Sequence, residues 1–455
     1  MQRESHALII GGSLAGLLAA RVLAKHFDRV TIIERDFFPE KPAPRPGIPQ
    51  SRHLHILLNQ GKILLEQLFP GLQNELVAAG AAILDPKSIA WFSPAGWAPQ
   101  FTPDDSDLTM FSRDLLDWVI RRRLVENTNV HFQEGGTVTG LLLNADRPEV
   151  TGVSVRFRDR QNPANIHTEN VNADLVVDAS GKVSQTPKWL QKLGYLPPQE
   201  TVINAFVGYA TAIYECSDRL SDKSAVFVTT APPFRTRGGA IFPIEDNRWL
   251  VTLGGGDRDY PPADETGFVE FARTLPTPLI YNAIKDAKPL TPISSYRGTE
   301  NRLRHYELLP RYPEKLVIIG HAVCAFNPVY GQGMTVAALD AQMLDECLKK
   351  QHQWHPEGYL TGFARQFQQK LAKLHTIPWT FAISQDSRYR GSTGAKPNLG
   401  TRLIIEYMEL VLKALVDDAK VCQAFLEVLH MIKPPVILFY PRIGFKAIGQ
   451  LVKGR

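Results

Sequence analysis

Short apolar runs alternate with helical patterns at the start of the chain. Residues 7–10 and 30–33 are runs of apolar and β-branched residues typical of buried strands, and apolar residues recur at helical spacing between them, over residues 14–26. This order predicts a strand–helix–strand unit. Two later runs of the same character, at residues 174–178 and 316–320, predict further strands of a parallel sheet.

The rest of the chain divides between helical and alternating patterns. Helical spacing predicts helices over residues 61–69, 113–124, 334–350 and 401–432. Prolines predict a loop between residues 39 and 49 and the end of the last helix before Pro434. A strand and a hairpin are predicted over residues 129–132, 138–143 and 150–157. Alternation between residues 201 and 300 predicts an antiparallel sheet, with strands at residues 205–214, 225–230, 239–244 and 249–253.

Composition narrows the class of protein. The chain has 455 residues, more than one hydrophobic core usually serves, which favours two domains and an additional segment. Its 44% hydrophobic and 21% charged residues are typical of a globular protein, and a net charge of +5 is too small to indicate nucleic-acid binding. Four widely separated cysteines argue against a disulfide framework or a zinc site. The N-terminus leaves no room for a signal peptide, and no apolar run reaches the roughly 18 residues of a spanning helix, so we expect a cytoplasmic protein.

A glycine-containing turn joins the first predicted strand to the first helix. Gly11 and Gly16 hold the first and third glycine positions of a dinucleotide-binding fingerprint, and Ser13 replaces the second. Backbone amides at such a helix N-terminus attract a pyrophosphate. Glu34, at the end of the second strand, is placed to bond a ribose hydroxyl. The pattern predicts a dinucleotide site, and the alternative is a structural strand-to-helix turn.

A second glycine-rich segment precedes the helix predicted at residues 334–350. Gly320 and His321 follow a predicted strand, and Gly331 and Gly333 lie just before the helix. Glycines at this position let a ring system lie against the backbone, where the positive end of the helix can stabilise negative charge on a reduced flavin. An ordinary glycine-rich helix entry is the alternative. Together with the first turn, this segment favours FAD as the dinucleotide.

Several motifs, in one order along the chain, resemble those of the flavin monooxygenases with a para-hydroxybenzoate-hydroxylase-like fold. Within this family the chain most resembles the bacterial polyether epoxidases, such as those of monensin and lasalocid assembly, and more distantly squalene epoxidase. The resemblance covers residues 6–350. It rests on the turn at residues 11–16 and on the segments at residues 33–36, 47–55, 112–117, 173–181 and 325–334.

The resemblance implies an α/β fold: a Rossmann-type FAD-binding domain with an inserted antiparallel-sheet substrate domain and a C-terminal helical region. We expect the FAD-binding domain at residues 1–200, with a return segment at residues 301–380. The substrate-binding sheet domain is expected at residues 201–300, and the helical region at residues 381–455.

The resemblance also assigns residues to the cofactor. Glu34 would hold the ribose, and Arg113 would lie beside the phosphates. Without the resemblance, Arg113 is expected to be a first-turn helix residue that forms a surface ion pair. Arg52, His53 and His55 would lie near the active face of the flavin, or serve as hydrogen-bonding loop residues. The full set of expected FAD-binding residues is Gly11, Ser13, Ala15, Gly16, Glu34, Arg35, Arg52, Arg113, His321, Gly331, Gly333 and Met334, the last three along the isoalloxazine ring.

Two departures from the family pattern concern the flavin and its reductant. The family's aspartate at the ribityl chain is His321 here, which can bond a hydroxyl but changes the local charge. The segment from Asp178 to Gly181 lacks the compact Asp-Gly of hydroxylases that NAD(P)H reduces directly. We therefore expect NAD(P)H to supply electrons either directly or through a separate flavin reductase.

The predicted activity is monooxygenation. Reduced FAD would react with O2 and pass one oxygen atom to a lipophilic alkene, polyketide or terpenoid, by epoxidation or hydroxylation. The cofactor performs the difficult step, and accordingly no side chain is predicted as a catalytic nucleophile or acid–base group and no metal is expected. The alternatives are an isoprenoid-type flavin reductase, desaturase or cyclase without oxygen insertion, and a non-catalytic flavoprotein.

The C-terminal tail combines apolar and basic residues. Residues 436–440 are apolar or aromatic, further apolar residues follow up to residue 452, and no acidic residue follows Glu427. Such a segment can lie in a membrane interface with anionic lipids. Docking of a C-terminal helix on the FAD-binding domain is the alternative, so peripheral membrane contact is left open.

Overall fold

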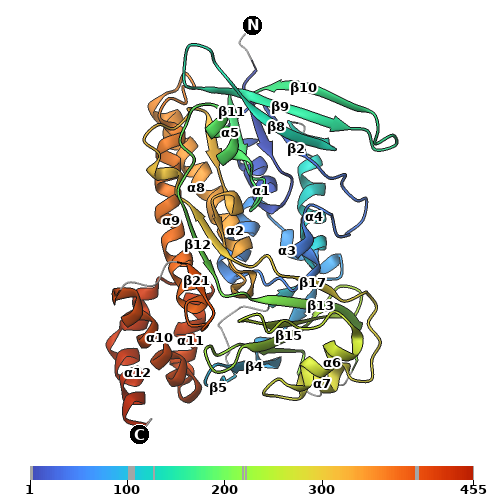
Figure 1. The fold of residues 1–455 in the computed structure, drawn as a ribbon, viewed down its shortest axis with the longest axis vertical. Helices are drawn as coiled ribbons and strands as arrows, with labels where there is room; N and C mark the ends of the chain where they lie inside the picture. Colours follow the sequence, from blue (N-terminus) through green and yellow to red (C-terminus); the bar gives the residue numbers. More distant parts are fainter. Residues whose placement is uncertain are drawn as a thin grey trace.

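A five-stranded parallel sheet forms the centre of one half of the molecule (Figure 1). This computed structural model describes residues 4–100, 108–126, 129–217, 220, 223–394 and 399–453. The strand order is β19-β11-β1-β2-β7. The strands are β1 (His6–Ile10), β2 (Arg29–Glu34), β7 (Val130–Glu134), β11 (Leu175–Asp178) and β19 (Leu316–Ile318). Each pair is parallel, so the carboxyl ends of strands from distant parts of the chain meet at one edge. The predicted strand–helix–strand unit and both later strands are confirmed.

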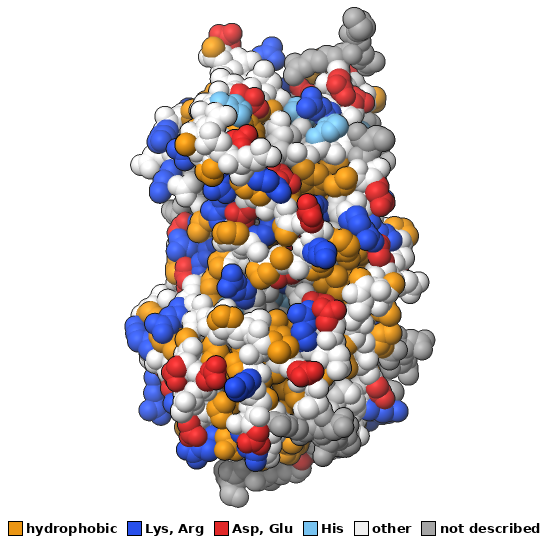
Figure 2. Space-filling view, turned by 90° about the vertical axis from the view of Figure 1, so that its right-hand side faces the viewer, with side chains coloured by type: hydrophobic (Ala, Val, Ile, Leu, Met, Phe, Trp, Pro, Cys, Tyr) orange, Lys and Arg blue, Asp and Glu red, His pale blue; other side chains and the backbone are white. Residues whose placement is uncertain are grey.

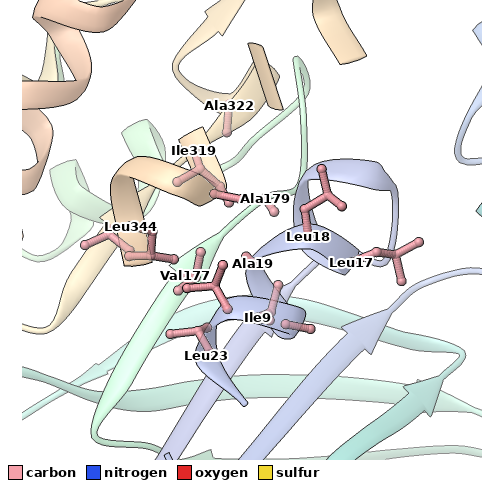
Figure 3. Packing of buried hydrophobic residues seen from close by; sticks show 14 of the residues in the cluster. Ile9, Leu17, Leu18, Ala19, Leu23, Val177, Ala179, Ile319, Ala322 and Leu344 are labelled. Carbon is pink, nitrogen blue, oxygen red and sulfur yellow. The ribbon is translucent and has the colours of Figure 1, made fainter. Parts of the chain in front are cut away.

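Helix α1 (Leu14–Leu23) is enclosed between this sheet and α8 (Gly333–Trp354). Figure 3 shows its apolar side chains among those of β11 and α8. Leu18, Val177 and Leu344 have no exposed surface there. Because α1 is apolar on nearly every side, burial holds it against the sheet.

Further helices and small sheets surround this core. The helices are α2 (Asn59–Leu68), α3 (Leu72–Ala78), α4 (Arg113–Val125), α5 (Thr186–Lys192) and α9 (Phe363–Asp386). A three-stranded sheet contains β8 (Gly136–Leu143), β9 (Val150–Arg158) and β10 (Ile166–Asn172), and a two-stranded sheet contains β3 (Ala82–Leu84) and β6 (Leu108–Met110). A four-stranded sheet contains β12 (Glu200–Asn204), β18 (Asn301–Arg304), β20 (Cys324–Ala325) and β21 (Thr393–Gly394). Helix α9 runs along one side of the molecule to the C-terminal helices (Figure 1).

The other half contains a seven-stranded sheet in the order β17-β13-β16-β15-β14-β4-β5. Its strands are β4 (Ile89–Ser93), β5 (Gly96–Trp97), β13 (Gly208–Glu215), β14 (Ala225–Val228), β15 (Arg237–Ile244), β16 (Arg248–Gly255) and β17 (Ser294–Tyr296). The antiparallel sheet predicted between residues 201 and 300 is confirmed, but β4 and β5 extend it from an earlier part of the chain. Strand β4 pairs in parallel with β14, a contact that local alternation does not reveal. Helices α6 (Glu265–Arg273) and α7 (Leu279–Ile284) pack on this half as well.

The C-terminal helices correct one prediction. The helix predicted over residues 401–432 is two helices, α10 (Leu399–Asp417) and α11 (Ala419–Leu429). Asp418 between them is extended, with φ −141°, and its carboxylate accepts hydrogen bonds from the backbone amides of Lys420 and Val421. This capping begins a new helix where apolar periodicity alone predicts a continuous one. The turn η7 (Pro435–Phe439) and α12 (Pro441–Lys453) follow, and α12 packs against α10.

The face shown in Figure 2 carries basic, acidic and apolar side chains next to one another. Figure 2 shows the side of the molecule turned away from the C-terminal helices, where Lys and Arg alternate with Asp and Glu among apolar patches. None of the described helices is both long and apolar enough to cross a membrane. The expected domain boundaries at residues 200, 300 and 380 stay predictions, and α9 continues through residue 380.

Candidate functional site

The turn between β1 and α1 is closed by two glycines. Gly11 has a positive φ of 101°, and a Cβ atom added there would lie 2.8 Å from the carbonyl oxygen of Ala179. A Cβ on Gly16 would lie 1.9 Å from the carbonyl oxygen of Gly11. Both clashes are with backbone, which cannot rotate away. The N-terminus of α1 therefore reaches the edge of the sheet only with glycine at these positions.

Glu34 lies directly behind this turn and is buried. Its carboxylate accepts hydrogen bonds from the backbone amides of Gly12, at 2.7 Å, and Asp36, at 2.9 Å. Arg45, which the sequence reasoning missed, donates to the carbonyl oxygen of Gly12 at 2.9 Å and lies 3.4 Å from the Glu34 carboxylate. The nitrogen in this buried ion pair, Nη1, makes no geometric hydrogen bond. That donor, beside the turn, fits an anionic or hydroxylated ligand.

Arg113 reaches the same turn from α4. Its guanidinium donates to Ser13 Oγ at 3.2 Å and to the Asp117 carboxylate at 2.9 Å, and only 7% of the residue is exposed. Arg113 is thus a first-turn helix residue in an ion pair, as the alternative expects, but the pair is largely buried at the glycine turn and not at the surface. The first turn of α1 contains no acidic residue that would repel a phosphate. The role of Arg113 at the FAD phosphates stays a proposal.

The second glycine segment lies against the first. Gly320 has a φ of +59°, and a Cβ added there would lie 2.9 Å from Cβ of Ala15 in α1. The backbone amide of Gly320 donates to the Asp340 carboxylate at 2.8 Å, and the other oxygen of Asp340 lies 2.7 Å from Nε2 of His375. Asp340 and His375 are buried and hold the turn from behind, a role that no sequence signal indicated.

Unpartnered polar atoms gather where this segment meets α8. Nε2 of His321 and Oε1 of Gln332 are buried without hydrogen-bond partners. Oγ1 of Thr335 is also without a partner but faces Gly61 of α2. Burial, and then the charges of Lys182 and Arg113, lower the pKa of His321 to about 4, so its ring is neutral at physiological pH. Because unpaired polar atoms are costly inside a protein, this cluster fits a ligand rich in hydroxyl groups.

The loop before α8 is held by a buried carboxylate. Asp386, at the end of α9, accepts hydrogen bonds from Nδ2 of Asn301 at 2.5 Å, from Nδ2 of Asn327 at 3.1 Å, and from the hydroxyl of Tyr330. Tyr209 of β13 donates to Asn327 at 3.0 Å. Burial raises the pKa of Asp386 to about 6. We call this set the Asp386 network; it joins α9, β18 and β13 to the loop that ends at residue 331.

The remaining expected cofactor residues lie in different environments: the second glycine segment, the hydrophobic core and the surface. Gly331 has a φ of +66°, and a Cβ on Gly333 would lie 2.9 Å from Nε2 of His321. Met334 packs in the main hydrophobic core. Arg35 and Arg52 are exposed at the surface, where Arg35 donates to the carbonyl oxygen of Gly47. The structure thus brings Gly11, Ser13, Ala15, Gly16, Glu34, Arg113, His321, Gly331 and Gly333 into one region and leaves the two exposed arginines outside it.

Two histidines of the segment 47–55 face the second half of the molecule. Nδ1 of His53 lies 2.7 Å from Oγ1 of Thr211, and Nδ1 of His55 lies 2.9 Å from the carbonyl oxygen of His53. Burial, and then Arg52, lower the pKa of His53 to about 4. Burial, and then Arg113, lower the pKa of His55 to about 3. Both rings are neutral hydrogen-bonding groups, as the loop interpretation expects.

A cavity of about 970 Å³ lies between these histidines, the seven-stranded sheet and the C-terminal helices. Its lining is mainly apolar. The loop before α8 contributes residues 328–331, and the segment before α2 contributes residues 53–56. The other walls include Trp91, Tyr209, Phe227, Phe242, Phe381, Leu412 and Phe425. Such a cavity is large enough for a sizeable organic molecule.

The sequence profile of a family described as the FAD binding domain matches residues 4–360. The chain belongs to this FAD-binding family. It is 34% identical over 357 residues to Protein Rv3254 of Mycobacterium tuberculosis, covering 76% of this chain and 73% of that protein. It is 26% identical over 369 residues to a kynurenine 3-monooxygenase of Salinispora arenicola, again covering 76% and 73%. The crystal structure of PqsL, a probable FAD-dependent monooxygenase from Pseudomonas aeruginosa, superposes with a TM-score of 0.63 at 12% identity, over 85% of this chain and 97% of that one.

The cofactor of this family fits the residues present. The glycine turn, with the Glu34–Arg45 ion pair beside it, suits a pyrophosphate and ribose, and the unpartnered atoms beside α8 suit a ribityl chain. The protein is an FAD-dependent enzyme of the monooxygenase type, and its fold is that of the flavoprotein monooxygenases. Closeness to the polyether epoxidases in particular is not among these findings.

Gly16→Val tests the glycine turn. The added side chain would meet the carbonyl oxygen of Gly11 and force α1 away from the sheet edge, so we expect the purified protein to lose nearly all of its FAD. The measurement is the flavin-to-protein absorbance ratio, with circular dichroism to confirm folding. Gly140→Ala is the matched control, because a Cβ there meets nothing within 4 Å. A folded Gly16→Val protein with stoichiometric FAD would show that the turn does not hold the cofactor.

His321→Asp tests the departure at the second loop. Lys182 and Arg113, whose charges disfavour a protonated His321, would stabilise a carboxylate at the same place. We therefore expect FAD to bind to this variant at least as tightly as to the wild type, while His321→Ala binds it more weakly. Titration of the apoprotein with FAD, followed by flavin fluorescence, measures both. Severe loss of FAD from a folded His321→Asp variant would assign the histidine a role of its own.

Proposed function

We propose that the protein inserts one oxygen atom from O2 into a lipophilic molecule held in the cavity, by epoxidation of an alkene or by hydroxylation. The observation that carries the proposal is the position of the cavity. It is lined by the loop at residues 328–331, which leads into helix α8, and it extends over one face of the seven-stranded sheet. Bound FAD supplies the oxygen-activation chemistry, and the protein supplies binding, orientation and exclusion of water.

The chain's own residues have separate parts in this proposal. The Asp386 network fixes the loop between the cofactor segment and the cavity, so that both keep one relative position. His53, hydrogen-bonded to Thr211, provides the polar side of the cavity near that loop. Aromatic and aliphatic side chains form most of the remaining wall and favour an apolar substrate such as an alkene, polyketide or terpenoid.

The source of electrons is NAD(P)H in this proposal, used directly or through a separate flavin reductase. Asp178, in the segment that departs from the family's Asp-Gly pattern, is buried and bonded locally. Its carboxylate accepts from the hydroxyls of Ser180, Ser184 and Thr186. These partners hold the carboxylate within the chain's own structure, and the proposal keeps both electron routes.

Isotope labelling tests the proposed reaction. The reduced protein is given 18O2 and an extract of lipophilic compounds, and products are examined by mass spectrometry. We expect a product heavier by one 18O atom and absent without the protein. A transformed product that carries no 18O would instead support the reductase, desaturase or cyclase alternative. Comparing NAD(P)H alone with NAD(P)H plus a flavin reductase identifies the electron route.

Peripheral contact with an anionic membrane is a second part of the proposal. On α12, Ile443 and Ala447 are buried against the neighbouring helices, whereas Phe445, Ile448 and Leu451 are exposed. One face of α12 is therefore docked, as the alternative expects, but it packs against the other C-terminal helices. Exposed Arg442 on the same helix suits anionic headgroups, and exposed Lys446 is ion-paired with Asp418 at 3.4 Å.

Substitution of the exposed face tests this contact. A triple variant with serine at Phe445, Ile448 and Leu451 should sediment less with phosphatidylserine-containing vesicles than the wild type, because it loses the apolar area that enters the interface. Phe234→Ser is the control, because Phe234 is 87% exposed but lies elsewhere. Equal sedimentation of wild type and triple variant would reject the membrane contact.

A further inference from the structure

The floor of the cavity is one continuous row of side chains across the seven-stranded sheet. Thr211 of β13 pairs with Thr252 of β16, Thr252 with Ala240 of β15, Ala240 with Phe227 of β14, and Phe227 with Trp91 of β4. Partners in register lie on the same face of a sheet. The last four of these residues line the cavity, so the cavity runs across the strands.

The chemical character changes along this row. One end is polar, because Thr211 bonds to His53 and also lies 2.8 Å from the hydroxyl of Thr252. Ala240 and Phe227 are apolar, and Trp91 at the end of the row adds an aromatic ring whose indole N–H is buried without a hydrogen-bond partner. Four strand spacings separate β13 from β4, which corresponds to about 19 Å. A molecule that follows the row is therefore elongated, with an apolar part that extends away from the cofactor loop.

At the far end of the row, a residue from the C-terminal helices packs on Trp91. Phe425 of α11 stacks on Trp91 with ring centroids 6.1 Å apart and an angle of 21° between the rings. Leu412 of α10 lines the cavity as well, and both residues are almost completely buried. Neither α10 nor α11 lies in the region from residue 4 to residue 360 that the family profile matches.

We infer that Trp91, Phe425 and Leu412 form a terminal wall that sets the maximum length of an elongated apolar substrate lying across the sheet. The assignment of the cavity as the substrate site rests on the proposed function. The wall limits length because it is built from large, packed side chains that cannot move aside without leaving a void. The cofactor segments do not contribute to it.

Competition binding to the FAD-loaded full chain tests this inference. The probe is Nile red, whose fluorescence reports an apolar cavity, and the competitors are straight-chain primary alcohols from hexanol to octadecanol. We expect affinity to rise about fourfold for each added methylene, up to a length limit beyond which it falls. Nile red binding that no alcohol displaces would overturn the assignment of the cavity to elongated apolar molecules.

Three variants locate the limit. Phe425→Ala should move it to longer alcohols, with about a tenfold gain for the first alcohols beyond the wild-type limit. Phe425→Leu should move it less, and Leu412→Phe should move it to shorter alcohols. Phe234→Ala is the control for the loss of an aromatic ring outside the cavity, because Phe234 is exposed and does not line the cavity. FAD content and circular dichroism confirm that each variant is folded.

The outcomes separate this inference from the proposed reaction. If the limit stays unchanged in both Phe425→Ala and Leu412→Phe, the terminal wall is elsewhere and the inference is wrong. If the limit moves but no 18O enters any product, the wall stands and the proposed oxygenation fails. A moved limit together with labelled product supports both.

Discussion

The approach of α1 to the edge of the parallel sheet is the constraint on which the cofactor site depends. It requires that no side chain separate Gly16 from the carbonyl oxygen of Gly11. Burial of α1 between the sheet and α8 then holds the helix in this position. Ala15 in its first turn meets Gly320, so the same helix also fixes the second glycine segment. Segments some 300 residues apart form one site because a single helix contacts both.

Local patterns in the sequence were sufficient for the parallel half of the fold and for the two glycine segments. Apolar runs and helical spacing are properties of neighbouring residues, and glycine positions report backbone constraints directly. The break at Asp418 was not predicted, because a capping side chain interrupts an apolar pattern without changing it. The addition of β4 to the large sheet was not predicted either, because it depends on pairing with a strand far along the chain.

The site residues that sequence reasoning missed are those that act through tertiary contact. Arg45 lies in a proline-rich loop with no motif, yet it reaches the backbone of Gly12. Asp340 with His375, and Asp386 with its asparagine and tyrosine partners, are spread over several elements. Each is a buried polar group whose partners are supplied by the fold, so its importance becomes visible only when burial and hydrogen bonding are known.

The origin of the cavity walls has an evolutionary consequence. The wall near the cofactor comes from segments that the FAD-binding family shares, whereas the opposite wall comes partly from α10 and α11, which lie outside the matched region. Mutations in these helices can change which molecules fit without disturbing the glycine segments. On the proposed function, divergence of one terminal region would alter substrate preference while the glycine segments stay unchanged. For laboratory evolution, libraries confined to residues 399–430 would sample specificity with little risk to cofactor binding.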